Sequence, residues 1–168
     1  MKVGLLVVLL YLISQFTEAN EKNYYLGAGL GAIVIDGEAL SAGGSGISFY
    51  GGYQFSETYK LELGYHYFSD VKDDPASISP TMLSISGLAF HSLSDQLSIF
   101  AKLGVSQWDA DINFSGIDIR TKGGTDLTTG FGFEFQSSDS IRWRQEYQYF
   151  QFDKDIVHTL FFSVNYQF

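Results

Sequence analysis

The chain ends in Ser163-Val-Asn-Tyr-Gln-Phe168, where polar and apolar residues alternate. A period of two places successive side chains on opposite faces of a β-strand. The apolar face extends back to residue 160 and comprises Leu160, Phe162, Val164, Tyr166 and Phe168. The opposite face carries Thr159, Ser163, Asn165 and Gln167. This pattern is typical of the closing strand of a membrane barrel, but a strand of a soluble protein can show it too. Features elsewhere in the chain distinguish these two alternatives.

The N-terminus has the features of a secretory signal peptide. Lys2 precedes an apolar run over residues 3–13, which is too short to cross a bilayer as a helix. Thr17 and Ala19 are small residues of the kind that signal peptidase prefers, so we expect cleavage before Asn20. A buried N-terminal helix is the alternative. The sequence therefore predicts a signal peptide at 1–19 and one domain at 20–168.

Composition excludes several classes of function. The chain has no cysteine, which rules out a lipobox anchor, disulfides and thiol chemistry. Its formal net charge is -9, which argues against binding nucleic acid through a basic surface.

Cleavage leaves about 149 of the 168 residues, and at roughly 18 residues per strand and connection this accommodates eight strands. The mean hydropathy is too low for a further membrane helix, yet 17% of the residues are aromatic. Strands that are apolar on one face only explain both facts. A soluble β-sandwich is the alternative, although it would bury its apolar face and need fewer exposed aromatic residues.

Eight alternating segments follow one another along the chain. The expected strands cover residues 23–34, 46–55, 59–68, 81–90, 96–107, 125–136, 140–152 and 157–168. Short connections at 56–58, 92–95 and 137–139 alternate with connections at 35–45, 69–80, 109–124 and 153–156. Both prolines lie in 69–80, which we therefore predict to be a loop. Short turns on the periplasmic rim and longer loops outside are typical of transmembrane barrels.

Aromatic residues near the strand ends are expected to form girdles at the two membrane interfaces. These candidates are Tyr24, Tyr25, Tyr59, Trp108 and Trp143.

Four pieces of sequence carry a family resemblance. They are Tyr24-Tyr25-Leu26-Gly27-Ala28, Gly52-Tyr53-Gln54-Phe55 with Leu61-Glu62-Leu63-Gly64-Tyr65, Leu103-Gly104 with Trp108, and Arg144-Gln145-Glu146-Tyr147-Gln148. Through them the chain resembles the transmembrane domain of the outer membrane protein A family and related small eight-stranded barrels. It has no room for the periplasmic peptidoglycan-binding domain of the longer members, so we do not expect it to tether the cell wall.

Charged residues occupy inward positions of the expected strands. They are Glu62, Lys102, Glu134, Arg142, Arg144 and Glu146. Ionised groups in so narrow a lumen must find partners, so one interpretation is a plug of mutual ion pairs. The resemblance implies another, because in that family an interior arginine and glutamates form a network whose rearrangement is implicated in opening a narrow pore. Glu62, Glu134 and Arg144 match those positions, but Leu88 replaces an expected lysine, for which Arg142 is a candidate substitute.

Catalysis is the third hypothesis, because some small outer-membrane barrels modify lipid A with a histidine, a serine and a carboxylate. The three histidines are His66, His91 and His158. None reproduces the His-x-Ser-Asn signature of lipid A deacylases, so we predict no enzymatic activity and no catalytic, cofactor or metal site.

The expected outer loops are acidic. Their carboxylates are Asp36, Glu38, Asp70, Asp73, Asp74, Asp109, Asp111, Asp118, Asp153 and Asp155. Solvation and turn formation explain most of them, and no twelve-residue calcium loop is present. In the loop at 109–124, Ile112, Phe114 and Ile117 are apolar and are candidates for a surface contact. Alternatively, they extend the fifth and sixth strands above the membrane.

The sequence thus predicts an all-β, eight-stranded antiparallel barrel in the outer membrane of a Gram-negative bacterium, reached by Sec-type export. We expect a monomeric structural or surface-interaction protein, with a low-conductance gated pore as the alternative and a lipid A-modifying enzyme as the third choice. Expected partners are outer-membrane lipids and lipopolysaccharide, host-surface or phage molecules at the loops, and the barrel-assembly machinery. Val164, Tyr166 and Phe168 are the candidate assembly signal.

Overall fold

The computed structural model describes residues 23–36, 41–69, 71–73, 76–114, 117–152 and 155–168, and the expected signal peptide lies outside them. For residues 36, 41–42, 71–73, 76–79, 110–114, 117–122, 151–152 and 155, only the backbone is described. No helix within the described ranges is long and apolar enough to span a membrane.

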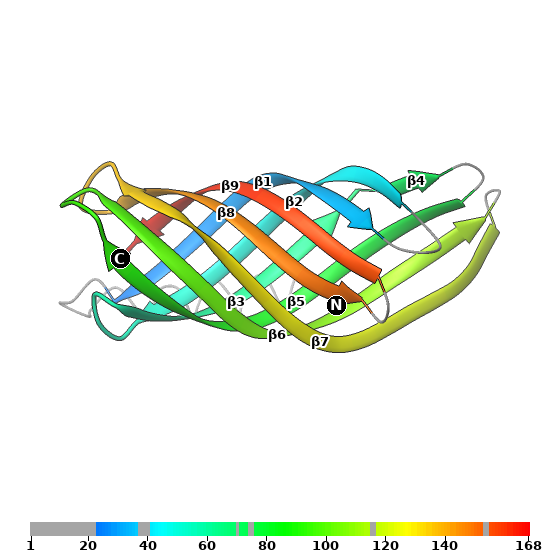
Figure 1. The fold of residues 1–168 in the computed structure, drawn as a ribbon, viewed down its shortest axis with the longest axis horizontal. Coiled ribbons are helices and arrows are strands. Elements are labelled where there is room, and N and C mark those ends of the chain that lie inside the picture. The colour runs from blue at the N-terminus through cyan, green and yellow to red at the C-terminus, as the bar shows by residue number, and fades with distance from the viewer. Residues whose placement is uncertain (1–22, 37–40, 70, 74–75, 115–116, 153–154) are drawn as a thin grey trace, which may run out of the picture.

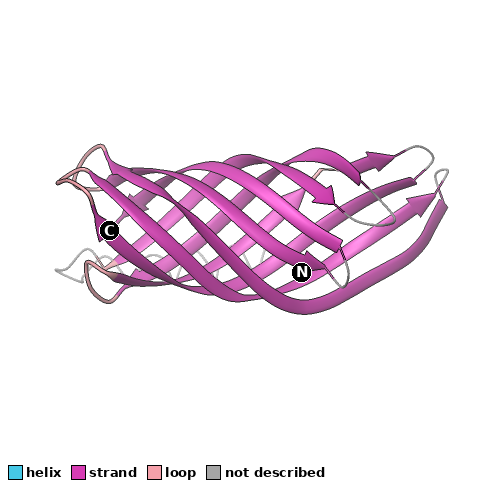
Figure 2. Cartoon of the chain, viewed as in Figure 1, coloured by secondary structure: helices cyan, strands magenta, loops and turns pink. Residues whose placement is uncertain are grey.

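The described residues form antiparallel strands that close into a barrel (Figures 1 and 2). The strands are β1 (Tyr24–Asp36), β2 (Ser41–Gln54), β3 (Tyr59–Phe68), β4 (Val71–Asp73), β5 (Ala76–Ser92), β6 (Leu97–Phe114), β7 (Ile117–Gln136), β8 (Ile141–Phe152) and β9 (Asp155–Gln167). Their order is β3-β2-β1-β9-β8-β7-β6-β5-β4, and pairing of β3 with β5 closes the circle. Because β3 and β4 both pair with β5 in succession, they are two parts of one barrel strand. The predicted eight-stranded barrel is therefore confirmed.

The strands are staggered around the barrel. The path of paired residues runs through Tyr59, Ala89, Ala101, Phe131, Tyr147, Leu160, Ala32, Ser45 and Ser69. One circuit thus ends at residue 69, ten residues beyond its start at residue 59. A stagger of this kind accompanies a strand tilt of about 35–45°, which lets eight strands enclose a lumen that side chains can fill.

Three short turns at one end of the barrel share one device. Ser56, Ser94 and Ser138 each accept hydrogen bonds through Oγ from the backbone N–H groups two and three residues later, at 3.1–3.4 Å. In each turn the residue before the serine also donates its N–H to the backbone carbonyl of the first residue of the next strand, at 2.8–3.0 Å. The repeated serine therefore supplies the acceptors that the turn backbone requires.

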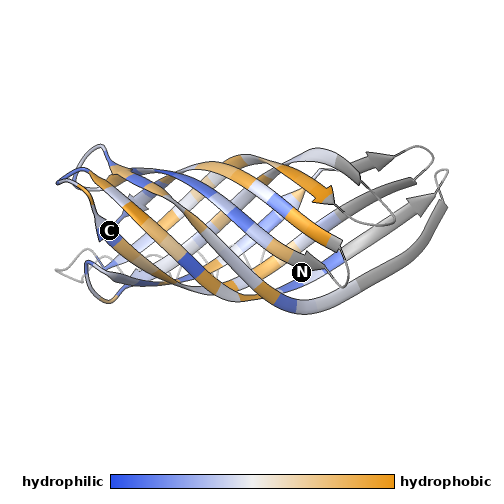
Figure 3. Ribbon diagram, in the orientation of Figure 1, coloured by the Kyte–Doolittle hydropathy of each residue, from blue (hydrophilic) through white to orange (hydrophobic). Residues whose placement is uncertain are grey.

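Alternation along the strands separates the lipid face from the lumen. On β3, exposed and buried residues alternate at every position, with Leu61, Leu63, Tyr65 and Tyr67 outside. Figure 3 shows hydrophobic and hydrophilic residues alternating along the barrel wall. The last strand behaves likewise, because Leu160, Phe162, Val164 and Tyr166 are exposed, while Phe168 is half-buried after the end of β9.

The lumen contains two groups of apolar side chains. The larger, which we call the apolar cluster, comprises Ile33, Ile35, Phe68, Met82, Trp108, Phe150, Val157 and Phe161. It lies toward the end opposite the short turns, since Phe68 is the last residue of β3 and Val157 is the third residue of β9. The smaller group comprises Leu88, Phe90 and Phe100 and lies near the short turns.

Strand lengths correct the expected loops at 69–80 and 109–124. β5, β6 and β7 have 17, 18 and 20 residues, whereas about 9–11 suffice to cross a membrane. Together with β4, which pairs with β5, they continue beyond the other strands at the end opposite the short turns (Figure 1). Pro80 lies within β5 and pairs with Ala110 on β6, and the interruption between β3 and β4 faces it on the other side. Since proline has no N–H to donate, it is tolerated where pairing on one side stops.

Two of the expected girdle residues face the lumen instead. Tyr25 and Trp108 are buried, whereas Tyr59 and Trp143 are exposed as expected and Tyr24 is intermediate. The phenol of Tyr25 donates to Glu62 at 2.9 Å, and the indole Nε1 of Trp108 donates to Asp126 at 2.7 Å. Each therefore has a polar partner inside the barrel, which a lipid-facing position would not provide.

Candidate functional site

Six ionisable side chains meet in the lumen near the short turns, and we call them the ionic network. Its members are Lys60, Glu62, Lys102, Glu134, Arg144 and Glu146. They come from β3, β6, β7 and β8, where the period of two turns each of them inward. All are buried, and their three positive and three negative formal charges balance.

Arg144 is the centre of the network and is fully buried. Its Nη1 donates to Glu62 at 2.6 Å, while Nη2 and Nε donate to Glu134 at 2.9 and 3.1 Å. Because β8 and β3 lie four strands apart in a circle of eight, the pair of Arg144 and Glu62 joins opposite walls of the barrel.

Two lysines complete the pairing. Lys102 lies between Glu62 and Glu146, with Nζ at 2.7 and 2.6 Å from their carboxylate oxygens. Lys60 donates to Glu134 at 2.8 Å. Every carboxylate of the network therefore has a cation within 3 Å, which is the arrangement that lets buried charges persist.

Aromatic rings enclose the guanidinium of Arg144. Its Cζ lies 4.9 Å from the ring centroid of Tyr50, 5.0 Å from that of Phe100 and 5.7 Å from that of Tyr25. Such positions favour a cation through the ring quadrupole. The hydroxyl of Tyr50 is hydrogen-bonded to both Ser163 and Asn165.

Glycines make room for the two tyrosines. On paired positions of β1 and β2, Tyr25 faces Gly52 and Tyr50 faces Gly27. A Cβ at either glycine would overlap the facing ring. Gly27 on β1 and Gly52 on β2 therefore allow two large rings to lie beside the network.

Five of the six charged residues predicted to line the lumen belong to the network, and the sixth lies at its edge. Glu62, Lys102, Glu134, Arg144 and Glu146 belong to the network, whereas Arg142 lies at its edge, 19% exposed and 3.6 Å from Glu134. Arg142 also donates to Gln54 at 3.4 Å. Lys60 was not among the predicted network residues, although Lys60 and Glu62 lie on the same inward face of β3. Lys60 pairs with Leu88 across β3 and β5, so a lysine lies beside the position at which the resemblance led us to expect one.

Other polar partners were also missed. Tyr25 and Asn165 both donate to network carboxylates, Asn165 to Glu134 at 3.1 Å. The alternation along β9 already placed Asn165 on the polar face, but nothing in the sequence indicated that Glu134 would be its partner.

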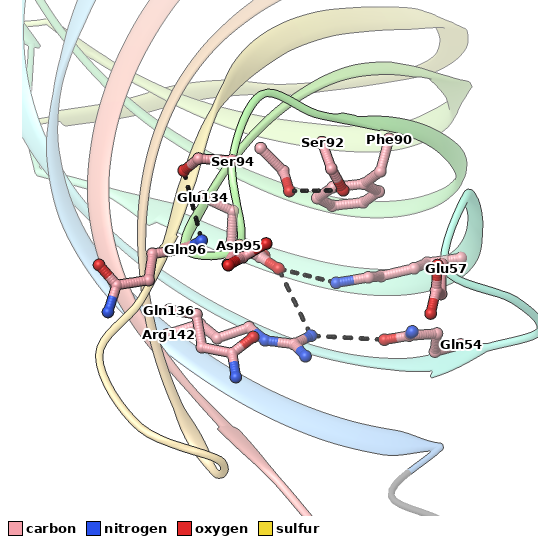
Figure 4. Close-up of a pocket in the computed structure, with 12 residues that line it drawn as sticks. Gln54, Glu57, Phe90, Ser92, Ser94, Asp95, Gln96, Glu134, Gln136 and Arg142 are labelled. Carbon is pink, nitrogen blue, oxygen red and sulfur yellow. Dashed lines mark hydrogen bonds and ion pairs between the residues drawn. The ribbon is translucent and has the colours of Figure 1, made fainter.

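A vestibule of about 440 Å³ leads from the short turns to the network (Figure 4). Residues of two turns, Glu57, Asp95 and Gln96, contribute to its wall, together with Arg142. Lys60 and Glu134 also line it, so the vestibule ends at the ionic network.

The three histidines lie apart from one another. His66 is buried in the lumen beside Phe68, Phe150 and Phe161. His91 is exposed near the second short turn, and Nδ1 of His158 is hydrogen-bonded to the hydroxyl of Tyr147. Within the described ranges, no group of three or more His, Asp or Glu is arranged to hold a metal ion.

The candidate surface residues of the 109–124 segment are described by their backbone alone. The side chains of Ile112, Phe114 and Ile117 lie outside those described, as do all of the acidic loop residues except Asp109, which is exposed.

Comparison with known proteins identifies the family. The chain matches the family described as outer membrane protein beta-barrel domain over residues 3–168. No curated protein sequence matches it.

Solved structures share the fold at low sequence identity. Neisserial surface protein A (NspA) superposes with a TM-score of 0.78 at 14% identity, covering 86% of this chain and 97% of that one. Ail, the attachment invasion locus protein of Yersinia pestis, in complex with the heparin analogue sucrose octasulfate, gives 0.67 at 14% identity, covering 87% and 98%. OprG from Pseudomonas aeruginosa gives 0.62 at 13% identity, covering 87% and 96%.

These solved structures share the barrel fold of this chain. The family match over nearly the whole sequence establishes that this chain belongs to the outer membrane protein β-barrel family and resides in the outer membrane.

Proposed function

We propose that the protein is a structural barrel of the outer membrane whose lumen is closed to solutes and whose outer end is an interaction surface. The observation that carries the first part is the ion pair between Arg144 and Glu62, which joins opposite walls at 2.6 Å. The six network side chains carry no net formal charge, so they offer no excess of one sign to attract a permeating ion, and these buried side chains occupy the space an ion would need.

A gated pore is the alternative, because each carboxylate of the network has more than one cation within reach. Glu134, for example, lies 2.8 Å from Lys60, 2.9 Å from Arg144 and 3.6 Å from Arg142. A switch of partners would open a path only if the side chains also moved off the axis. We favour closure because all of the network side chains are already paired and buried.

Planar-bilayer recording of the refolded protein tests closure. We expect no unitary currents from the unaltered protein at either polarity. As a control, the same preparation should show the gel shift between unheated and boiled samples that a folded barrel gives. Discrete openings from protein that passes this control would overturn closure and establish the pore.

The second part of the proposal concerns the extension formed by β5, β6 and β7. β7 pairs with β8 only from Thr128 onward, so among the described residues its segment 117–127 has a partner on one side alone. An unpaired strand edge can accept an extended segment of another protein by strand addition. Apolar residues also pair across the extension, Ile78 with Ile112 and Ala76 with Phe114.

The partner of this surface should be neither polyanion nor nucleic acid. The structure of Ail contains a heparin analogue, which is strongly anionic. This chain carries a net charge of -9, and the strand segments at its outer end include Asp36, Asp73, Asp109, Asp111, Asp118 and Asp155. Like-charge repulsion disfavours such ligands here, so we propose a protein surface with exposed backbone or apolar groups, in addition to the surrounding lipids.

Shortening the hairpin tests the surface. Asp109 pairs with Gly123, so residues 110–122 can be replaced by an Asn-Gly turn without touching the membrane-spanning part. We expect cells displaying the shortened protein to lose adhesion to host-cell monolayers relative to cells displaying the full chain at equal surface level. Equal adhesion of the two would remove the extension from the proposal and leave the closed barrel.

We also propose that the protein has no catalytic activity and acts as a monomer. His66 is sealed inside the barrel, and His158 already has a tyrosine partner, so neither is poised to activate a serine for lipid substrates. Lipid A from cells expressing the protein should be unchanged in mass, and any mass shift would reopen the enzyme hypothesis. Val164, Tyr166 and Phe168 remain the candidate signal for the barrel-assembly machinery.

A further inference from the structure

Two strands show the order in which side chains follow one another along the lumen. From the short-turn end, the inward residues of β3 are Lys60, Glu62, Gly64, His66 and Phe68. Those of β8 are Arg144, Glu146, Gln148 and Phe150. On both strands, charged residues come first, a polar residue follows, and an aromatic ring lies furthest from the short turns.

The aromatic level belongs to the apolar cluster, whose members come from β1, β3, β5, β6, β8 and β9. Phe68, Phe150 and Val157 have no exposed surface. The ring of Phe161 lies 6.1 Å from that of Phe68 and 5.5 Å from that of His66. Contributions from so many walls place apolar groups across the lumen, and an apolar constriction excludes ions by dewetting.

Buried polar atoms without partners lie between the two levels. They are Nδ1 of His66, Oγ of Ser86, Oγ1 of Thr128 and Oγ1 of Thr159. Ser86 pairs with Glu62 of the network on one side and with Gly104 on the other, and Gly104 in turn pairs with Thr128. We call these four residues the polar belt.

Unpaired atoms of this kind indicate enclosed water. An unsatisfied buried donor or acceptor destabilises the folded protein, and buried waters in proteins bind at such groups. One missing partner could reflect a side-chain rotation, but the belt has one on each of β3, β5, β7 and β9.

We infer that the lumen has two independent barriers, the ionic network on the periplasmic side and the apolar cluster on the extracellular side, with ordered water bound in the polar belt between them. The inference rests on the proposed closure and goes beyond it, because the network alone no longer accounts for the seal. Disrupting the network should admit water and small ions from the periplasmic side as far as the belt, and no further.

Cysteine accessibility tests this directly, since the chain has no cysteine of its own. Ser86→Cys places one thiol in the belt with little change of shape. Silver ion, which is close to water in size, is added to one side of oriented proteoliposomes, and unreacted thiol is counted with a maleimide after unfolding. Ser94→Cys, in an exposed short turn, is the control that should react from the periplasmic side in every background.

Three backgrounds separate the barriers. We expect the thiol of Ser86→Cys to be protected from both sides in the otherwise unaltered chain. Arg144→Ala should abolish protection from the periplasmic side alone, and Phe161→Ala with Phe150→Ala should abolish it from the extracellular side alone. Only the combination of all three changes should conduct in planar bilayers. Should these variants fail the gel-shift control, Glu134→Gln and Phe161→Ala supply milder changes on each side.

The outcomes also separate this inference from the proposed function. Currents from the unaltered protein overturn closure itself. A silent unaltered protein with a conducting Arg144→Ala variant leaves closure standing and overturns the second barrier. Protection of the thiol in all folded backgrounds overturns the enclosed water, because a dry, continuous core would then extend from network to cluster.

Discussion

Arg144→Met should destabilise the folded barrel by about 3 kcal/mol, the lower end of the range for removing one partner of a buried ion pair. Methionine keeps most of the volume of the side chain but none of its donors. The variant therefore removes the charge at the centre of the network while leaving the packing against the surrounding rings largely in place.

The size of this destabilisation depends on which cation partners Glu62 and Glu134 retain in the variant. Three hydrogen bonds are lost, at 2.6, 2.9 and 3.1 Å, each worth about 1.5–3 kcal/mol when one partner is charged. Glu62 retains Lys102 at 2.7 Å, however, and Glu134 retains Lys60 at 2.8 Å. Neither carboxylate is left alone, which is why we expect the lower end of the range.

Equilibrium unfolding in urea with refolded protein in lipid vesicles measures the loss, with the gel shift as an independent readout. A second variant, Arg144→Met with Glu134→Gln, restores balance between the two lysines and the carboxylates of Glu62 and Glu146. We expect it to lose at least about 1 kcal/mol less than the sum of the single changes, because the sites interact directly. Additive losses, or a loss below about 1 kcal/mol for Arg144→Met, would refute the reasoning from charge pairing.

Three further outcomes follow from the fold. Gly52→Ala should lower the free energy of unfolding by about 1–3 kcal/mol, because the new Cβ overlaps the facing tyrosine ring. Gly87→Ala is the control and should lower it little, since its new Cβ has no heavy atom closer than 4.0 Å. Equal unfolding midpoints of the two variants would contradict this. Ser94→Ala should cost about 1 kcal/mol in urea unfolding, because two backbone N–H groups lose their acceptor, and an unchanged midpoint would show that water replaces it. With Trp143→Phe, the remaining fluorescence of Trp108 should resist quenching by brominated lipid, and strong quenching would place that indole outside the barrel.

Period-two alternation was sufficient to predict the barrel and the inward charges, because one physical rule governs both faces of every strand. The same alternation also predicts inward positions for Trp108 and Lys60. Trp108 lies in the same phase as Lys102, which was assigned to the lumen, yet the preference of tryptophan for membrane interfaces decided its predicted position. Lys60 likewise lies in phase with Glu62.

Other features could not be predicted from the sequence for physical reasons. Ion-pair partners depend on which strands face each other across the lumen, and this follows from the stagger, which no single strand reveals. The interior of membrane barrels is usually polar, so the sequence did not predict that Phe68 and Phe150 belong to an apolar cluster inside the lumen. The loop expected at 69–80 was inferred from its prolines and aspartates, but strand pairing beyond the membrane overrides that local preference. At 109–124 the structure follows the alternative interpretation, in which the strands extend above the membrane.

The distribution of the ionic network over β3, β6, β7 and β8, with further donors from β1 and β9, has a consequence for assembly. A sheet that has entered the bilayer without closing would expose carboxylates and cations whose partners are still absent, and such charges are costly in hydrocarbon. Pairing of β1 with β9 brings the last donors to Glu62 and Glu134. Closure and charge neutralisation therefore occur together. The ionic network thus favours cooperative insertion and disfavours open, partly assembled sheets in the bilayer.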